Sequence, residues 1–295
     1  MLPSMGATYR ARSFTAGVLA VAMWAAGCGD GAIGALDGAV TEDLTAAPAD
    51  LGRHRDLYSP PVPQVSVRGV LLDDDGTPRE STVMSVCSQA GCSYGKSAVD
   101  GSFVVQRVAL GVFTVHSIDD WTTIPHRGTV ARTLLGSHDG EVLEAGEMRT
   151  PLMPLGVPLP ADPAVPGTIL PGDGLALTLR AADLDLPLTA VDQSIAARRI
   201  PDQRIPPFDF PGEEVLAVYC VLPWWTTSKS PIGVSATVAA PAGSAVHFRS
   251  ISGVTGLPSA PAVGVASGDG LSVATSDGQG LGELTWIVIS RPLAP

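Results

Sequence analysis

The sequence predicts an all-β protein that contains two β-sandwich domains. Gly and Pro are abundant, with 33 and 26 copies among 295 residues, so about one residue in five forms turns or breaks helices. From Gln64 onward, apolar residues such as Val65 and Val67 alternate with polar ones, which is the period of a half-buried strand. Clusters of Gly, Asp and Pro separate the alternating runs. These three observations exclude an all-helical bundle.

The charge balance argues against nucleic acid as a partner. The formal net charge is -11, and among the 18 basic residues only Lys96 and Lys229 are lysines. Domains that bind nucleic acid carry clustered positive charge, and this sequence has no such cluster. We therefore expect partners of another class.

Residues 1–27 are expected to form a signal peptide. Arg10 and Arg12 precede an apolar run over 14–26, which is too short to cross a bilayer as a helix. The run ends in Trp-Ala-Ala-Gly-Cys at 24–28. This ending resembles the lipobox of bacterial lipoproteins, although Ala25 stands where those proteins usually have Leu. The alternative is an ordinary secretory signal that is cleaved at an Ala-rich site.

The resemblance to bacterial lipoproteins implies a lipid anchor at Cys28. In these proteins the Cys thiolate receives diacylglycerol, and the acyl chains then hold the protein on a membrane. Gly29 follows in place of Asp, which implies the outer membrane under the retention rule known for enteric bacteria. The sequence does not decide which face of that membrane carries the protein. Residues 28–63 contain scattered acids with many Ala, Gly and Pro residues, and we expect a disordered tether.

The first β domain is expected over residues 64–151. A strand pattern begins at Gln64, and further strand candidates lie between turn clusters at 82–87, 102–108, 112–117, 128–134 and 141–148. Four short groups of residues stand out: Val67, Gly69 and Val70; Asp75, Gly76 and Pro78; Asp100, Gly101 and Phe103; Gly111, Phe113 and Val115. They resemble the carboxypeptidase regulatory-like domain. That resemblance implies a transthyretin-like sandwich of seven strands and a module without catalytic activity.

Two cysteines in this domain are expected to form a disulfide. Cys87 and Cys92 have the spacing of a hairpin, in a chain that we expect to be exported into an oxidising compartment. A metal pair is the weaker alternative, because only two thiols lie close together in the sequence. Cys220 is expected to be a buried, inert thiol.

A second β-rich domain, of unknown family, is expected over residues 152–295. It opens with a Pro-rich stretch, and strand candidates follow at 175–180, 214–222, 232–239, 245–251 and 281–289. The nearest helix candidate covers 181–200, but Leu184, Leu186 and Pro187 spoil its periodicity.

Three local patterns match the sequence motifs of a serine nucleophile, a zinc site and a calcium loop, but their expected structural context does not fit. Ser93 lies in a Gly-x-Ser-x-Gly sequence, but the expected hairpin is not the strand-to-helix turn that a nucleophile elbow needs. His138 and Glu141 have the spacing of a zinc pair, with His247 as a third candidate ligand, but they fall on an expected turn. The acidic run at 73–75 lacks the alternating ligands of a calcium loop and is interpreted as a plain turn.

Trp224 and Trp225 are the candidate ligand-binding residues. Neighbouring side chains in a strand face opposite sides, so at least one ring should reach the surface, where it could stack on a sugar or a partner protein. Packing between the domains explains the pair equally well. We expect no catalytic residue, no metal and no cofactor. The sequence favours a lipid-anchored structural or interaction protein of the cell envelope, whose partner would be an envelope protein or a polysaccharide. A glycan-binding module is the alternative, and a hydrolase is third.

Overall fold

A computed structural model of the chain describes residues 63–118, 125–187, 193–208, 210–253 and 255–293. Every described residue belongs to one compact unit of the chain, Ser59–Pro295. The expected signal peptide, the expected lipidation residue Cys28 and nearly all of the expected tether therefore lie outside the described residues. In the described ranges, no helix is long and apolar enough to cross a membrane.

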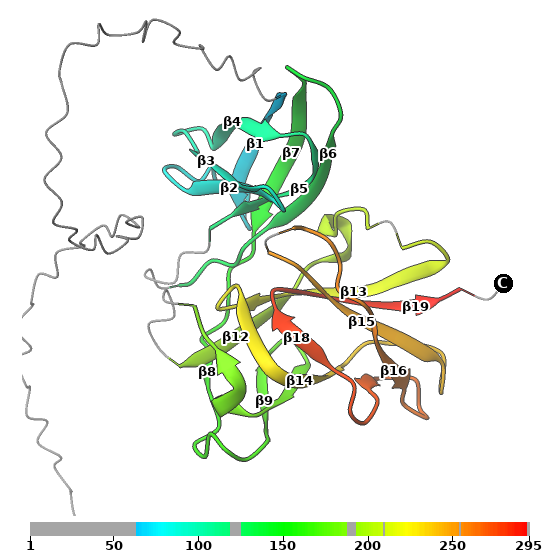
Figure 1. Ribbon diagram of the computed structural model, residues 1–295. Coiled ribbons are helices and arrows are strands. Elements are labelled where there is room, and N and C mark those ends of the chain that lie inside the picture. Colours follow the sequence, from blue (N-terminus) through cyan, green and yellow to red (C-terminus); the bar gives the residue numbers. More distant parts are fainter. Residues whose placement is uncertain (1–62, 119–124, 188–192, 209, 254, 294–295) are drawn as a thin grey trace, which may run out of the picture. The chain divides into compact units, whose positions relative to one another are not determined.

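The all-β prediction is confirmed by the structure (Figure 1). The strands of the amino-terminal half are β1 (Gln64–Asp73), β2 (Val83–Ser88), β3 (Gly91–Lys96), β4 (Ser102–Ala109), β5 (Gly111–Ser117), β6 (Ala131–Gly136) and β7 (Val142–Thr150). They form a three-stranded sheet in the order β4-β1-β7 and a four-stranded sheet in the order β3-β2-β5-β6. Seven strands in two sheets are what the resemblance to the regulatory-like domain implied.

Strand alternation builds the core between these two sheets. In β1, Val65 and Val67 are fully buried, while Arg68 points away from the core. Phe103 of β4 and Phe113 of β5 fill the space between the sheets, together with residues of β2 and β7. The inward side chains of the two sheets form one closed hydrophobic cluster, which is the usual basis of a sandwich.

A single curled sheet makes up the carboxyl-terminal half. Its elements are β8 (Val157–Pro158), β9 (Gly167–Gly172), β10 (Leu175–Leu179), the 3-10 turn η1 (Ala181–Asp183), β11 (Leu184–Asp185), β12 (Ser194–Arg199), the 3-10 turn η2 (Asp202–Arg204), β13 (Glu213–Leu222), β14 (Thr226–Ala236), β15 (Ala245–Ile251), β16 (Ala262–Ala266), β17 (Val273–Thr275), β18 (Leu281–Leu284) and β19 (Trp286–Pro292). The main path runs β8-β12-β13-β19-β15-β16-β17-β14-β10-β9, and β11 and β18 pair with β14.

The two ends of this path approach each other, so the sheet surrounds its own core. The backbone N–H of Arg199 in β12 donates to the carboxylate of Asp173, which follows β9, over 2.9 Å. A Cβ on Gly172 would lie 2.3 Å from the carbonyl oxygen of Ala197, so only glycine permits this approach. The enclosed cluster includes Leu177, Tyr219 and Phe248.

The prediction of a single strand over 281–289 is wrong. The alternation over 281–289 covers two strands, because β18 pairs with β14 whereas β19 pairs with β13 and β15. Thr285 separates them. Its buried hydroxyl donates to the carbonyl of Ile251 over 2.6 Å, and its carbonyl accepts from the N–H of Val221. These bonds fix the break at Thr285. The helix candidate over 181–200 holds the three residues of η1, strand β11 and strand β12 where it is described.

Candidate functional site

A cavity of about 240 Å³ lies where the two halves meet, and we call it the junction pocket. It is lined by Asp74, Val130, Ala131, Arg132, Glu147, Met148, Arg149, Pro151, Ile200, Pro201, Gln203, Arg204, Ile205, Pro206, Pro207 and Trp286. The amino-terminal half contributes the turn after β1, strand β6 and strand β7. The carboxyl-terminal half contributes the segment around η2 and the start of β19.

The floor of the junction pocket is apolar and fixed. Trp286 is 1% exposed, and its indole N–H donates to the carbonyl of Thr129 over 2.8 Å. The thiol of Cys220 donates to the same carbonyl over 3.3 Å. Met148 and Ile200 are also buried beside the cavity. Because the indole N–H bonds the other half of the chain, Trp286 joins the two halves beneath the pocket.

A β-bulge in β7 places Arg132 at the pocket. Along β1, Arg68 pairs with Glu144 and Gly69 pairs with Gly146, so Ala145 is the extra residue. Gly146 has φ +69°, and the guanidinium of Arg132 donates to the carbonyl of Ala145. A Cβ on Gly146 would lie 2.8 Å from Nη1 of Arg132. The bulge therefore supplies both an acceptor and the space for this guanidinium.

Two further arginines lie at the same pocket, each with a carboxylate. Arg204 of η2 donates to the carboxylate of Asp74, and its Nη2 lies 3.1 Å from the Asp74 carbonyl oxygen. Arg149 of β7 pairs with Glu147. Three guanidinium groups thus meet two carboxylates, in a chain whose formal net charge is -11. Because arginine stays protonated, the chemistry of this lining suits an anionic group better than proton transfer.

A second polar cluster lies on β13, β15 and β19. The carboxylate of Glu213 accepts two hydrogen bonds from Arg249, both 2.7 Å, and one from the Ser290 hydroxyl over 2.6 Å. Nδ1 of His247 lies 3.0 Å from the same carboxylate. The bonds from Arg249, and then those from Ser290 and His247, lower the pKa of Glu213 to about 2. The Arg249 guanidinium also lies over the Phe210 ring, 4.7 Å from its centroid. This cluster is a satisfied ion pair that holds three strands together.

The two candidate tryptophans have different environments. Trp224 is 4% exposed and belongs to a buried cluster, whereas Trp225 is 38% exposed with φ +69°. They follow a cis peptide between Leu222 and Pro223, in a turn rather than a strand. Only Trp225 therefore offers an indole to solvent, and the separation comes from the turn instead of strand alternation.

His116 lies beside both indole rings. Its ring stacks on Trp224 at 6.2 Å and meets Trp225 edge-on at 5.8 Å. Burial lowers the pKa of His116 to about 4, so the ring is neutral at neutral pH. The described residues give no hydrogen-bond partner to Nδ1 of His116 or to the indole N–H of Trp224. The rings of Trp224 and Trp225 thus pack around His116.

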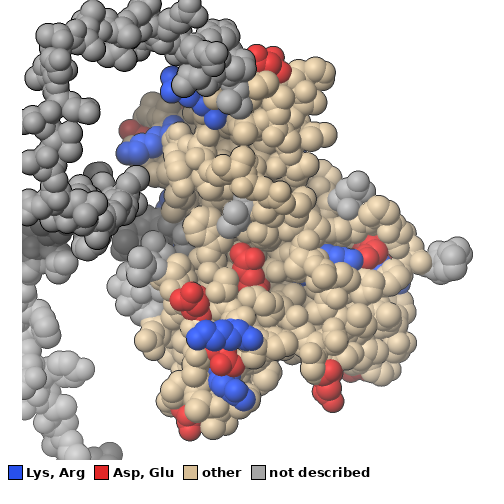
Figure 2. Space-filling view, in the orientation of Figure 1, with Lys and Arg blue, Asp and Glu red and all other residues tan. Residues whose placement is uncertain are grey.

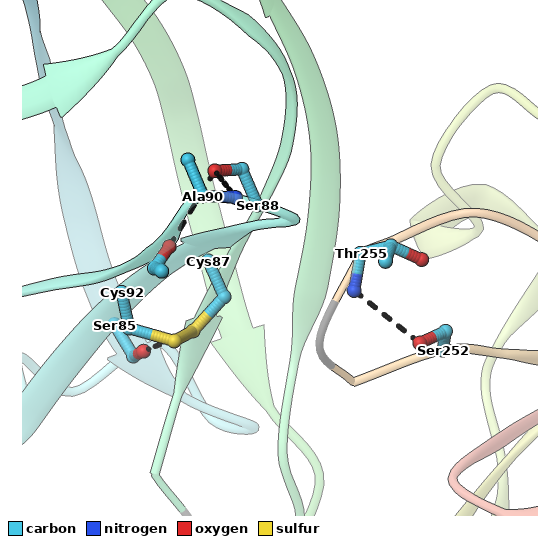
Figure 3. Close-up of a disulfide and its surroundings, with 8 residues drawn as sticks. Ser85, Cys87, Ser88, Ala90, Cys92, Ser252 and Thr255 are labelled. Carbon is cyan, nitrogen blue, oxygen red and sulfur yellow. Dashed lines mark hydrogen bonds between the residues drawn. A yellow bond between two sulfur atoms is a disulfide. The ribbon is translucent and has the colours of Figure 1, made fainter.

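The predicted disulfide between Cys87 and Cys92 is confirmed, and it joins directly paired residues of β2 and β3 (Figure 3). The hydroxyl of Ser85 lies 2.9 Å from the Cys87 sulfur. The turn between the two cysteines is closed by the N–H of Ala90, which donates to the Ser88 hydroxyl over 3.2 Å. Cys220 is a buried free thiol, as predicted.

The residues that nominally matched catalytic or metal sites do not converge. The Ser93 hydroxyl donates to the Arg107 carbonyl over 3.0 Å. His138 has an 82% exposed side chain on a turn, where the Glu141 carboxylate accepts the N–H groups of 137 and 138. His247 instead contacts Glu213. In the described ranges, no three His, Cys, Asp or Glu side chains gather closely enough to hold a metal ion.

The acidic run after β1 is divided among different partners. The Asp73 carboxylate accepts two hydrogen bonds from the Arg127 guanidinium, at 2.7 and 3.0 Å, while Asp74 forms an ion pair with Arg204. Asp75 accepts the backbone N–H of Thr77 over 2.9 Å, which lowers its pKa. Each carboxylate therefore has a separate structural role, in agreement with the turn interpretation.

The arginines of the junction pocket carried no recognisable motif in the sequence. Arg132, Arg149 and Arg204 lie on three separate elements, and only the fold brings them together. The one available signal was the chain's strong preference for Arg over Lys, because arginine is favoured where a planar carboxylate is held.

Comparisons with known proteins do not assign the chain to a family. No protein-family model matches it, and no curated protein matches its sequence. A solved Bacteroides uniformis protein, classed as a candidate carbohydrate-binding protein, is 10% identical with a TM-score of 0.22, over 78% of this chain and 100% of its own. The Bacillus cereus major pilin BcpA is 10% identical with a TM-score of 0.22, over 76% and 87%. The Corynebacterium diphtheriae major pilin SpaD is 10% identical with a TM-score of 0.23, over 78% and 56%.

Proposed function

We propose that this chain is a lipid-anchored, non-enzymatic binding protein of the bacterial cell envelope. The observation that carries the proposal is the order of its parts. A lipobox-like ending at Cys28 is followed by an acidic stretch rich in small residues, and then by the compact unit Ser59–Pro295. This order suits a folded β unit that is held near a membrane on a flexible stem.

The environment of the motif residues supports a role without catalysis. A nucleophilic serine needs a base within hydrogen-bond reach, yet the Ser93 hydroxyl is used by the Arg107 carbonyl. His138 is held on an exposed turn beside Glu141. We expect Ser93→Ala and His138→Ala to leave the fold and the function intact. Labelling by a fluorophosphonate that Ser93→Ala abolishes, or bound zinc that His138→Ala removes, would favour a hydrolase instead.

The surface charge supports a partner other than nucleic acid. On the face drawn in Figure 2, charged side chains are scattered and of both signs, and they leave no continuous basic area. A protein or polysaccharide of the envelope is the partner that the proposal names.

Replacement of the acylated cysteine tests the anchor. Cells that express the full chain would receive an alkyne fatty acid, and membranes would then be separated from the soluble fraction. Cys28→Ser should lose the label and leave the membranes, because the acyl chains supply the binding free energy. Cys220→Ala is the matched control and should keep both, because Cys220 is buried in the folded unit. Unchanged labelling of Cys28→Ser contradicts the proposal.

Glycan binding is a second candidate function, and the exposed indole of Trp225 is the observation that favours it. An indole face can hold a sugar ring by stacking and CH contacts. Trp225→Ala should then abolish retention of the protein on envelope polysaccharide, whereas Trp225→Phe should keep part of it. Tyr94→Ala is the control, since Tyr94 is another exposed aromatic residue, on β3. Equal retention of Trp225→Ala and the unsubstituted protein contradicts this candidate.

A further inference from the structure

We infer that the junction pocket binds a small organic carboxylate with an apolar body, about the size of one acylated amino acid. The inference rests on the proposed function, because it names the ligand class of a binding protein. It also has its own test, since the pocket lies in the folded unit and does not depend on Cys28.

The size of the cavity sets the size of the ligand. Its volume of about 240 Å³ lies below the roughly 300–1,000 Å³ of pockets that take drug-sized molecules. A single small molecule or one terminal residue of a larger one fits, whereas an oligosaccharide does not. The closed floor at Trp286, which is 1% exposed, limits the depth.

The arginines define the charged end of the ligand. Each guanidinium carries five N–H donors, and the described bonds use one in Arg132, one in Arg149 and two in Arg204. The remaining donors can form the paired bonds that a planar carboxylate accepts. Arg132 is the best placed of the three for this role, because its bond goes to the neutral carbonyl of Ala145 and leaves its charge uncompensated by a carboxylate.

The walls define the other end of the ligand. Met148, Ile200, Ile205 and two prolines at 206 and 207 line the cavity and offer aliphatic surface, while Gln203 adds one amide side chain to the lining. Burial of an apolar group there is favourable at about 25 cal/mol per Å². A sugar carries hydroxyls all around its ring, and along this wall they would lose their hydrogen bonds to water. The lining therefore favours an aliphatic carboxylate over an acidic sugar.

Asp74 competes with the ligand for Arg204. Its carboxylate already pairs with that guanidinium and adds negative charge at the mouth of the pocket. Removal of this charge should strengthen carboxylate binding, which is an effect that a loss of structure would not produce.

The test is calorimetric titration of the purified full chain with N-acetyl-L-leucine and with 4-methylpentanoate, against buffer blanks that contain the same detergent. Both probes carry a carboxylate and an isobutyl group. The first resembles the carboxyl end of a peptide and the second is a free acid. Binding of either probe supports the inference. The ratio of the two affinities shows whether the pocket prefers the carboxyl end of a peptide or a free acid. N-acetyl-L-leucinamide, which lacks the charge, should bind at least about tenfold more weakly.

Substitutions locate the binding. Arg132→Gln and Arg204→Gln should each weaken it about tenfold or more, whereas Arg68→Gln should leave it unchanged. Arg68 is a matched control, because it pairs with Glu144 outside the pocket. Asp74→Asn should strengthen binding severalfold, and Asp75→Asn, in the same turn, should not.

Three results overturn the inference: no binding of either carboxylate up to about 10 mM, equal binding of the amide, or binding of D-glucuronate alone. If Arg132→Gln fails to fold, the results for Arg204→Gln and Asp74→Asn still decide. Unchanged labelling and membrane retention of Cys28→Ser, with pocket binding intact, would count against the proposed function alone. Loss of anchoring in Cys28→Ser, with no carboxylate bound by the unsubstituted chain, would count against this inference alone.

Discussion

Arg204 and Asp74 form an ion pair across 130 positions of the sequence. The pair links the 3-10 turn η2 of the carboxyl-terminal half to the turn that follows β1. It lies at the mouth of the junction pocket, above the buried Trp286. The contact therefore joins the two halves beside the pocket for which we infer carboxylate binding.

Asp74→Asn should change the free energy of unfolding by less than about 1 kcal/mol, because ion pairs between partly exposed groups contribute little. Urea denaturation of this variant, of Arg204→Gln and of the double variant gives the coupling between the two groups. A coupling above about 2 kcal/mol would contradict this view and would make the pair a structural clamp.

Gly146→Ala should destabilise the protein by about 1–3 kcal/mol, because φ is +69° and the new Cβ would lie 2.8 Å from Nη1 of Arg132. Gly140→Ala is the matched control, with φ +75° and nothing within 4 Å of the added Cβ. Gly140→Ala should lower the free energy of unfolding only by the strain of a positive φ at alanine. Denaturant unfolding measures both, and an equal loss in the two variants would show that Arg132 is not held by the bulge.

Glu213→Gln should cost about 3 kcal/mol at neutral pH, because it leaves the buried Arg249 without its carboxylate. Glu214→Gln should cost less than about 1 kcal/mol, since Glu214 forms an exposed pair with Arg291. Thermal unfolding of both variants measures the difference.

The Glu213 carboxylate should also make the free energy of unfolding depend on pH. The folded protein lowers the pKa of Glu213 from 4.5 to about 2, so its contribution is complete above about pH 4.5. The contribution is then lost as the pH falls toward 2, because the proton binds the unfolded chain more tightly. Glu213→Gln should flatten this part of the stability curve. An unchanged slope between pH 4.5 and 2 would mean that other carboxylates carry the acid sensitivity.

Replacement of both Cys87 and Cys92 by Ala should lower the unfolding free energy by about 2 kcal/mol, because the disulfide closes a short loop. Mass spectrometry of non-reduced peptides should find this bridge and a free thiol at Cys220 in the exported protein. Free thiols at 87 and 92 in that sample would contradict the assignment.

The sequence predicted those strands whose alternation of apolar and polar residues matches the side chains that are buried in the structure. Strand β15 has the predicted bounds, Ala245–Ile251, and the apolar residues Val246 and Phe248 alternate into the core at its start. The disulfide was predictable because both cysteines lie on one hairpin. The break at Thr285 was not, because the hydrogen bonds that fix it go to Ile251 and Val221 on other strands.

The candidate site was largely hidden from the sequence. The pocket depends on a bulge at Gly146 and on side chains that five separate segments bring together. No spacing rule connects Asp74, Arg132 and Arg204, because only the tertiary structure places them side by side. The paired tryptophans drew attention as neighbours, but the turn after the cis peptide at Pro223 decides which one is exposed.

The mass of the amino-terminal peptide of the mature protein, isolated from membranes of the native host, shows most directly whether the protein is lipid-anchored. We expect a chain that begins at Cys28 and carries a thioether-linked diacylglycerol on that residue. The same peptide from cells that express Cys28→Ser should be unmodified. A mature chain that begins at another residue, or an unmodified Cys28 in the membrane fraction, would contradict a lipid-anchored envelope protein.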